Sequence, residues 1–409
     1  MTETNFKHTD LGLIPHDWEV KTLGEICDVR DGTHDSPKYV KSGYPLVTSK
    51  NLNNGIIDFE NIQYISKDDY DKINERSKAD VGDILYAMIG TIGNPVLITK
   101  EPDFAIKNVA LFKDIKKVCQ AYIRYFFDSN DTIKRIMEDA SGSNQKFIPL
   151  GYFRKMPIIL PPTLAEQERI AGALSSIDTL IGALTEQIEK KRHIKQGAMQ
   201  QLLTGKKRLA GFTGEWEERR LDEIGFLTAG GTPSTMEPSY WGGDINWLQS
   251  GAVQNCIITP DAVIKTITKA GLQNSAAYLI KPDSVLIAIT GATCANVGYL
   301  TFESAANQSV VSIEPNEENC AMFLFQKLLT ERTNILSNKG GSAQSGVTLK
   351  ALKQLTIVVP PTIAEQSAIA TVLSRMDTEI AALEQKRDKY IAIKSGMMQN
   401  LLTGKIRLV

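Results

Sequence analysis

The feature that most constrains this chain is a long internal repeat. Shifting the sequence by 199 positions aligns residues 161–209 with residues 360–408 without a gap, and 28 of the 49 aligned positions are identical. Identity at this level indicates an internal duplication. Because the period is about half of the 409-residue chain, the unit is too large for a solenoid repeat. The sequence therefore predicts two copies of one large module.

The repeated block is predicted to form one long helix in each copy. A proline pair opens the block and blocks any earlier helical start. A threonine with a glutamate three residues later then gives the pattern of a capping box. A glycine near the end of the block is expected at the C′ position, so each helix should have roughly 40 residues and a length of about 60 Å. These positions are Pro161, Thr163, Glu166 and Gly205 in the first copy, and Pro360, Thr362, Glu365 and Gly404 in the second.

Apolar residues along the block are spaced by four and three, which is the heptad pattern of helices that pack side by side. The predicted seam changes register near Ile194, Met199 and Leu202 in the first copy, and near Ile393, Met398 and Leu401 in the second. A long helix with a narrow apolar stripe needs a partner, so we expect the two copies to pack antiparallel about a pseudo-twofold axis. Formation of a homodimer through the same seam is the alternative. The seam contains Ile170, Leu174, Ile177, Ile181, Leu184 and Ile188 in the first copy, and Ile369, Leu373, Met376, Ile380 and Leu383 in the second.

The two variable regions are predicted to be mixed α/β domains. Runs rich in β-branched and aromatic residues, such as DILYAMIG and SVLIAITG, are separated by Gly, Asn and Asp turns. One amphipathic helix is expected in each region, at about Ala121 to Asp139 and at Met322 to Asn334. A short strand, PIIL or TIVV, precedes each long helix. The predicted fold class is α/β (α+β), with domains at 1–160 and 210–359 and helical segments at 161–209 and 360–409.

Composition narrows the class of protein. Apolar residues make up 42% and charged residues 23% of the chain, which is ordinary for a soluble globular protein. No apolar run is long enough to span a membrane, and the N-terminal segment lacks the apolar core of a signal peptide, so a cytoplasmic location is expected. The five cysteines and four histidines show no metal-ligand spacing, and we expect neither a metal site nor a disulfide.

The repeated motifs resemble those of a known family. PPTLAEQ at 161–167, PPTIAEQ at 360–366 and the two LLTGK segments are similar to the specificity subunit of type I restriction-modification enzymes, and the resemblance covers the whole chain. It implies that each variable region is a target recognition domain that reads one half of a bipartite, asymmetric site in double-stranded DNA. It also implies that the helices set the gap between the half-sites, that two methyltransferase (modification) subunits dock beside the helices, and that restriction subunits can join.

The resemblance assigns helix pairing and partner docking to positions in the repeated block. These positions are the motif residues and the seam. They are Thr163, Glu166, Gln167, Ile170, Leu174, Ile181 and Leu184 in the first copy, and Thr362, Glu365, Gln366, Ile369, Leu373, Ile380 and Leu383 in the second.

The chain lacks the motifs of the enzymes with which such a subunit works. There is no [DNS]-PP-[YF] motif of an amino-methyltransferase and no GxxxxGK[ST] phosphate-binding loop. We therefore expect a non-catalytic subunit without a cofactor. Two alternatives stay open, namely an orphan methyltransferase complex without restriction and a coiled-coil scaffold without a role in DNA binding.

Charge limits where DNA could bind. Residues 1–160 and 210–359 together contain 31 basic and 37 acidic residues, so a DNA-binding face has to be local. One candidate is a lysine patch, whose alternative is a solvated surface. The other is a pair of small-residue turns found in both halves, whose alternative is a purely structural turn. The candidates are Lys107, Lys113, Lys116, Lys117 and Lys146 for the patch, and Gly32, Thr33, Gly231, Thr232, Ser143, Gln145, Ser342 and Gln344 for the turns.

Overall fold

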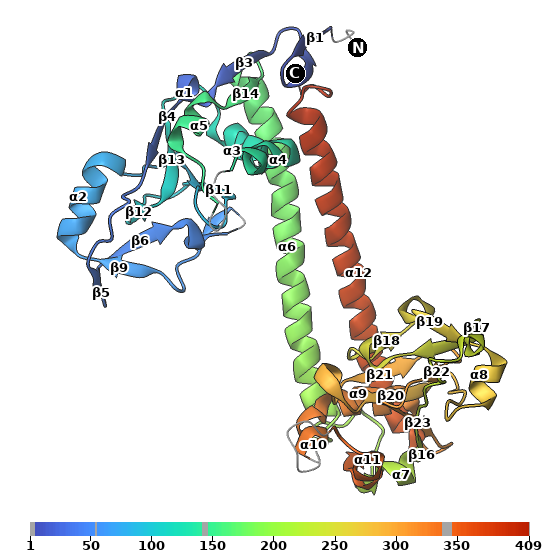
Figure 1. Cartoon of the computed structure of the whole chain (residues 1–409). Helices are drawn as coiled ribbons and strands as arrows, with labels where there is room; N and C mark the ends of the chain where they lie inside the picture. The colour runs from blue at the N-terminus through green and yellow to red at the C-terminus, as the bar shows by residue number, and fades with distance from the viewer. Residues whose placement is uncertain (1–4, 54, 141–145, 338–345, 409) are drawn as a thin grey trace. The chain divides into compact units, whose positions relative to one another are not determined.

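The protein divides into two compact units. A computed structural model describes residues 5–53, 55–140, 146–337 and 346–408. Unit 1 consists of Met1–Glu186 and Glu384–Val409, and unit 2 consists of Gln187–Leu383. Each unit therefore contains one variable region and a part of both long helices. Figure 1 follows the chain from its N-terminus to its C-terminus by colour.

The two long helices are α6, Leu164–Leu202, and α12, Ile363–Leu401, each of 39 residues. Both begin directly after the Pro-Pro-Thr sequence, and the prediction of one long helix in each repeated block is confirmed. Gly205 and Gly404 have φ values of +71° and +70°, the left-handed conformation expected of a glycine that ends a helix. In the described part of the chain, no helix has an apolar stretch long enough to cross a membrane.

Unit 1 contains two four-stranded sheets. The first is antiparallel with the order β11-β10-β13-β4, and the second has the order β12-β6-β9-β5, with β12 parallel to β6. Three strand pairs complete the unit, β14-β3, β1-β2 and β7-β8. The strands are β1 Phe6–Thr9, β2 Gly12–Pro15, β3 Glu19–Thr22, β4 Cys27–Asp31, β5 Tyr39–Val40, β6 Tyr44–Thr48, β7 Leu52–Asn53, β8 Ile56–Ile57, β9 Gln63–Ile65, β10 Ile84–Ala87, β11 Gly93–Leu97, β12 Ala105–Lys107, β13 Val109–Asp114 and β14 Pro157–Leu160.

The described residues of unit 1 also form shorter α-helices. They are α1 Leu23–Ile26, α2 Lys67–Ser77, α3 Gln120–Asp128, α4 Asn130–Asp139 and α5 Leu150–Lys155. The single helix predicted for about Ala121 to Asp139 is wrong, because the chain breaks between α3 and α4 at Ser129. The hydroxyl of Ser129 accepts the N–H of Thr132 at 3.3 Å and thereby caps a new helix. Phe127 of α3 and Phe153 of α5 pack against Phe112 of β13 and form an aromatic cluster in the core.

Unit 2 repeats this arrangement. Its larger sheet has the order β16-β23-β20-β21-β18, and its smaller sheet has the order β19-β17-β22, with β22 parallel to β17. The pair β15-β24 corresponds to β3-β14 of unit 1, so the short strands PIIL and TIVV are both confirmed. The strands are β15 Glu217–Arg220, β16 Gly225–Ala229, β17 Trp241–Leu248, β18 Cys256–Ile258, β19 Lys265–Ile267, β20 Ser284–Ala288, β21 Val297–Leu300, β22 Ala305–Ala306, β23 Val310–Pro315 and β24 Thr356–Val359.

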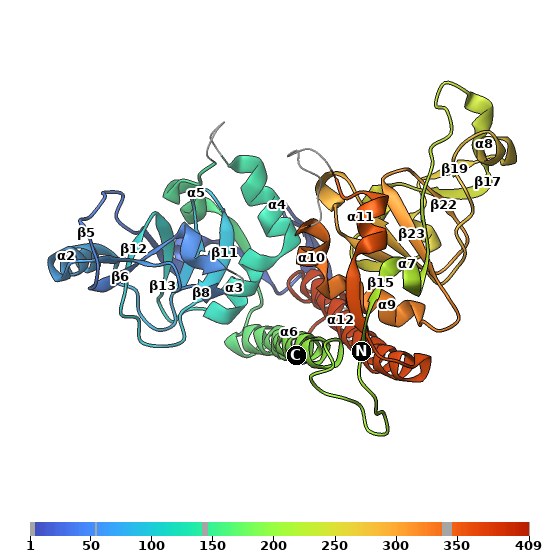
Figure 2. The same cartoon turned by 90° about the horizontal axis from the view of Figure 1, so that it is seen from below.

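The shorter helices of unit 2 are α7 Leu221–Ile224, α8 Lys269–Gln273, α9 Ala321–Thr330, α10 Arg332–Ser337 and α11 Leu349–Gln354. The helix predicted for Met322 to Asn334 is again two helices, since the chain breaks at Glu331. α11 packs against α7, as Figure 2 shows. The sheets, the strand pair and the helices α9 and α11 thus recur in the order seen in unit 1, which explains the duplication in the sequence.

Candidate functional site

The glutamate of the first PPT-x-AEQ motif lies at the start of α6 and binds an arginine from the end of the chain. Arg407 donates from Nε to Oε1 of Glu166 at 2.5 Å and from Nη2 to Oε2 at 2.9 Å. The same guanidinium donates to both carboxylate oxygens of Asp17 at 3.0 Å. The hydrogen bond to Glu166 raises the pKa of Arg407, and the hydrogen bond from Arg407 lowers the pKa of Asp17. Only 3% of the Glu166 side chain is exposed, so this ion pair is shielded from water.

Unit 2 contains the same contact between the other two copies of the motifs. Arg208, which follows the first LLTGK segment, donates from Nη2 to Oε2 of Glu365 at 2.7 Å and also from Nε to Oε1. Its remaining donors reach the carbonyl oxygens of Gly214 and Thr213. The arginine of each block therefore binds the glutamate of the other block, which gives a physical reason for the repetition of both motifs.

This geometry corrects half of the predicted capping box. The hydroxyl of Thr163 accepts the N–H of Glu166 at 3.2 Å, and Thr362 accepts that of Glu365 at 3.3 Å, as expected. The carboxylates, however, are turned toward Arg407 and Arg208. The threonines cap the long helices, and the glutamates bind arginines that are far away in the sequence.

The glutamine of the motif connects the long helix to a short one. Gln167 donates to the carbonyl oxygen of Pro161 at 3.0 Å and accepts the N–H of Cys119, the N-cap of α3, at 2.9 Å. In unit 2, Gln366 makes the equivalent bonds to Pro360 at 3.2 Å and to Cys320, the N-cap of α9, at 2.8 Å. Both glutamines are buried. Each one positions the short helix of its domain against the start of the long helix.

Ion pairs connect α6 and α12 within each unit. In unit 1, Asp178 of α6 lies 2.7 Å from Lys394 of α12. In unit 2 the repeat-related pair is Lys195 with Asp377 at 2.5 Å. Positions late in one helix face positions early in the other, so the segments run antiparallel in both units.

Asp178 also anchors α3 to the long helix. Its Oδ2 accepts hydrogen bonds from Arg124 at 3.0 Å and from the hydroxyl of Tyr125 at 2.8 Å. Burial opposes ionisation of Asp178, but the hydrogen bonds from Lys394, Arg124 and Tyr125 outweigh it and lower its pKa. Arg124 therefore faces α6 and not solvent.

The predicted apolar seam is buried mainly at its ends. Ile170, Leu174, Ile369 and Leu373 are at most 1% exposed and belong to the cores of the two α/β domains. Leu184 and Ile380 are buried, whereas Ile181 and Leu383 are half-buried. The predicted change of register is confirmed in part. Leu202, Met398 and Leu401 are buried and Met199 is half-buried, whereas Ile194 and Ile393 are 50% and 39% exposed.

The candidate lysine patch is not a uniform surface. Lys113 is only 16% exposed and donates to Asp83 at 2.6 Å and Asp80 at 2.5 Å. Burial opposes the charge on Lys113, but these hydrogen bonds raise its pKa. Lys116 is exposed and pairs with Asp114. Lys117 and Lys146 are exposed as well, and the role of all four residues in DNA binding stays a prediction.

The Gly-Thr turns lie at comparable places in the two domains, but with a shift of one residue. The N–H of Gly32 donates to Val109 and that of Thr33 to Ile106. In unit 2 the matching bonds are made by Gly230 to Val310 and by Gly231 to Ala306. Gly231 therefore occupies the place of Thr33, and Thr232 lies one residue further along, which corrects the alignment made from the sequence.

These glycines have a clear structural role. A Cβ atom at Gly32 would lie 2.2 Å from the carbonyl oxygen of Ile106, and one at Gly231 would lie 2.2 Å from the carbonyl carbon of Ala276. Close backbone approach therefore requires glycine at both positions. Beside the turns, the ammonium of Lys107 donates to the hydroxyl of Ser36 at 2.9 Å, and Thr232 donates to Gln308. The remaining candidates in the turns, Ser143, Gln145, Ser342 and Gln344, lie outside the described residues.

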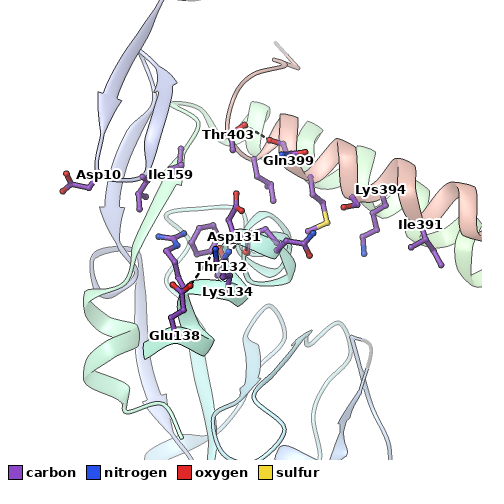
Figure 3. Close-up of a pocket in the computed structure, with 18 residues that line it drawn as sticks. Asp10, Asp131, Thr132, Lys134, Glu138, Ile159, Ile391, Lys394, Gln399 and Thr403 are labelled. Carbon is purple, nitrogen blue, oxygen red and sulfur yellow. Dashed lines mark hydrogen bonds and ion pairs between the residues drawn. The ribbon is translucent and has the colours of Figure 1, made fainter. Parts of the chain in front are cut away.

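A cavity of about 590 Å³ opens in unit 1 between α4 and the C-terminal part of α12. Figure 3 shows Asp131, Thr132 and Lys134 of α4 on one side and residues of α12, including Lys394 and Gln399, on the other. The lining contains three carboxylates, Asp10, Asp131 and Glu138, and three cations, Lys134, Arg135 and Lys394. Neither sign of charge dominates. In the part of the chain that the structure describes, no cluster of three His, Cys, Asp or Glu residues could hold a metal ion.

Comparison with known proteins establishes the class. Residues 15–191 and 213–392 match the model of the type I restriction modification DNA specificity domain, and together they cover most of the chain. The chain therefore belongs to this family. Membership confirms the prediction of a specificity subunit, which is neither the methyltransferase nor the nuclease of such a system.

Similarity to individual proteins extends over the full length. A protein named as the MjaX specificity subunit of a type I restriction enzyme, from Methanocaldococcus jannaschii, is 28% identical, and the alignment covers 99% of this chain and 97% of that protein. The EcoR124I/EcoR124II specificity subunit of Escherichia coli is 25% identical over 71% of this chain and 72% of its own. The crystal structure of the S subunit from M. genitalium has the same fold, with a TM-score of 0.62, 15% identity, and coverage of 98% and 97%.

Arg208 and Arg407 are the residues that sequence reasoning missed. Both lie in the most similar part of the repeat, three residues after the glycine of LLTGK, and both are retained in that block. The signal that could have identified them is that both copies of the block retain this arginine together with the glutamate of the PPT-x-AEQ motif. Their partners could not be assigned, because the contacts span 157 and 241 residues of sequence.

Proposed function

We propose that this chain is the DNA sequence-recognition subunit of a type I restriction-modification complex and reads a bipartite site in double-stranded DNA. The α/β domain of each unit reads one half-site. α6 and α12 pack as an antiparallel coiled coil and set the spacer between the half-sites. Two methyltransferase subunits dock beside the helices, and restriction subunits can join the complex. The division into domains at 1–160 and 210–359 and helical segments at 161–209 and 360–409 belongs to this proposal.

The observation that carries the proposal is the repeated assembly of each unit. Glu166 with Arg407 and Glu365 with Arg208 form the same buried contact in the two units, and each contact joins the start of one long helix to the segment after the other. Two similar units in one chain provide two readers of DNA with diverged surfaces. A site with two different halves requires such a pair of readers.

Partner docking is proposed for the repeated block for a related reason. Two identical methyltransferase subunits need two equivalent surfaces, and the repeated block provides nearly the same sequence twice. The motif residues Thr163, Glu166 and Gln167 are engaged in intramolecular contacts. We therefore propose that the exposed positions around these motif residues form the docking surface. The buried motif residues hold the backbone that shapes this surface.

The test is an exchange of one reader. Replacing residues 1 to about 155 by those of a relative should change one half of the methylated sequence and leave the other half unchanged, because the second domain is self-contained. The measurement is genome-wide mapping of methylated sites in cells that also express the methyltransferase subunits. A change in both half-sites would contradict the modular assignment.

The two alternatives predict other outcomes of related experiments. A subunit of an orphan methyltransferase complex would give the same methylation without cleavage of unmodified DNA, which a phage-restriction assay detects. A scaffold without a role in DNA binding would leave the methylated sites unchanged when its gene is deleted.

A further inference from the structure

The two readers share one backbone corner that carries different side chains. In unit 1 the corner is formed by the Gly32-Thr33 turn and the end of β12, where Thr33 and Lys107 form a parallel bridge. In unit 2 it is formed by Gly230-Gly231 and the end of β22. The hydrogen bond from Gly32 to Val109 measures 3.0 Å and the one from Gly230 to Val310 measures 2.9 Å. The two corners therefore have matching backbone hydrogen bonds.

Glycine is required in both corners because two backbone segments approach each other closely there. A Cβ atom at Gly230 would lie 2.3 Å from the carbonyl oxygen of Ala306, as one at Gly32 would from Ile106 at 2.2 Å. The glycines hold the turn against the strand end in the same way in each domain. The strand β12 or β22 thereby ends at an equivalent place in each domain, and the chain continues into the connection that leads to β13 or β23.

The polar side chains that the two corners present differ in chemistry. Unit 1 presents Lys107, which is half-buried and whose ammonium donates to the hydroxyl of Ser36 at 2.9 Å. In unit 2, Asn307 follows Ala306 at the place of Lys107, and the connection from Ala306 to Val310 is one residue longer than that from Ile106 to Val109. The next residue of this connection, Gln308, is exposed, and its Oε1 accepts a hydrogen bond from Thr232. A shared frame with a variable, pre-oriented polar side chain is expected of a base contact, because contacts to phosphates do not need to differ between half-sites.

We propose that Lys107 and Gln308 read base edges in the major groove, Lys107 a guanine in one half-site and Gln308 an adenine in the other. The ammonium of lysine is a donor only and matches the two acceptors O6 and N7 of guanine. The amide of glutamine has both a donor and an acceptor and matches N6 and N7 of adenine. This inference rests on the proposed function, since it assumes that each domain reads one half-site.

The experiment uses the complete complex with its methyltransferase subunits and a DNA library in which both half-sites are randomised. Lys107→Ala should relax one guanine position of one half-site and reduce discrimination there by about 5- to 100-fold. Lys107→Arg should retain guanine, because arginine binds the same two acceptors, and Lys107→Gln should shift the preference toward adenine. Gln308→Ala should relax one adenine position in the other half-site.

Lys100→Ala is the matched control, because Lys100 is an exposed lysine of the same domain that lies outside both the corner and the candidate lysine patch. It should leave the recognised sequence unchanged. An equal loss of methylation at all sequences in the Lys107→Ala complex would overturn the inference, since it would make Lys107 a phosphate contact. An unchanged sequence would overturn it as well.

The experiments distinguish a failure of the base assignment from a failure of the proposed function. If the domain exchange alters one half-site while both alanine variants keep the original sequence, only the base assignment fails. If Lys107→Ala alters both half-sites, the modular function fails and the base assignment fails with it.

Discussion

The buried contact between Glu166 and Arg407 shows how single residues hold the repeated block together. The carboxylate is 3% exposed and accepts two hydrogen bonds from one guanidinium, whose other side binds Asp17. Removing one partner of a buried ion pair is strongly destabilising, because the other charge is left buried without a partner. The same holds for Glu365 and Arg208 in unit 2.

At this scale we predict that Arg407→Ala destabilises unit 1 by about 3 kcal/mol, because it leaves the charge of Glu166 buried and unpaired. Chemical denaturation followed by circular dichroism measures the effect. The control is Lys191→Ala, which removes a more exposed ion pair with Glu379 and should cost less than about 1 kcal/mol.

The double variant Glu166→Leu with Arg407→Leu separates the cost of an unpaired charge from the loss of packing. It should be more stable than Arg407→Ala, because no charge remains buried. If both variants are equally destabilised, the ion pair contributes through its shape and not through its charge.

At the scale of elements, α6 and α12 are the parts of the chain that belong to both units. The repeat-related ion pairs Asp178–Lys394 and Asp377–Lys195 define the register of the antiparallel segments. An insertion keeps the apolar residues on one face of the helix only if its length is close to a whole number of turns, because 3.6 residues make one turn.

We predict that inserting four residues after Ile188 lengthens α6 by about 6 Å and rotates the remainder of the helix by roughly 40°. The apolar stripe stays nearly in phase, so the protein should fold and methylate the same half-sites with a spacer longer by one or two base pairs, at about 3.4 Å each. Methylation mapping gives the spacer directly. Insertion of two residues is the control, since a rotation of roughly 200° should destabilise the helix pair. A folded four-residue variant with the original spacer would show that the helices do not set the distance.

At the scale of the whole molecule, charge is the limiting property. Residues 1–160 and 210–359 together contain 31 basic against 37 acidic residues, and some of the basic residues form ion pairs within their unit. Lys113 is held by Asp80 and Asp83, and Arg124 is held by Asp178. These two cations are therefore engaged within unit 1, and contacts to phosphates supply much of the affinity of DNA-binding proteins.

We therefore predict that the purified chain alone binds DNA weakly and becomes specific only with methyltransferase subunits. A gel-shift titration at about 150 mM salt, with and without those subunits, measures the difference. Specific binding by the isolated chain with a dissociation constant in the nanomolar range would contradict the prediction.

The sequence by itself determined the duplication, the start and end of both long helices and the mixed α/β character of the two domains. Each of these depends on local signals, such as the prolines before Thr163 and Thr362, the glycines at 205 and 404, and short β-rich runs. The sequence did not reveal the breaks at Ser129 and Glu331, since the apolar periodicity continues through both. It also placed Ile194 and Ile393 in the seam, although both are largely exposed.

Only the tertiary structure decided which residues the repeated motifs bring together. Glu166 meets Arg407 across 241 residues of sequence, and Glu365 meets Arg208 across 157. The same applies to the corner at Gly32 and Gly230. The backbone hydrogen bonds match Gly32 with Gly230, although the repeated Gly-Thr sequence matches Gly32 with Gly231. Spacing along a chain encodes helices and turns because their hydrogen bonds are local. Contacts between distant segments depend on how the sheets and helices pack, and packing is a property of the folded molecule.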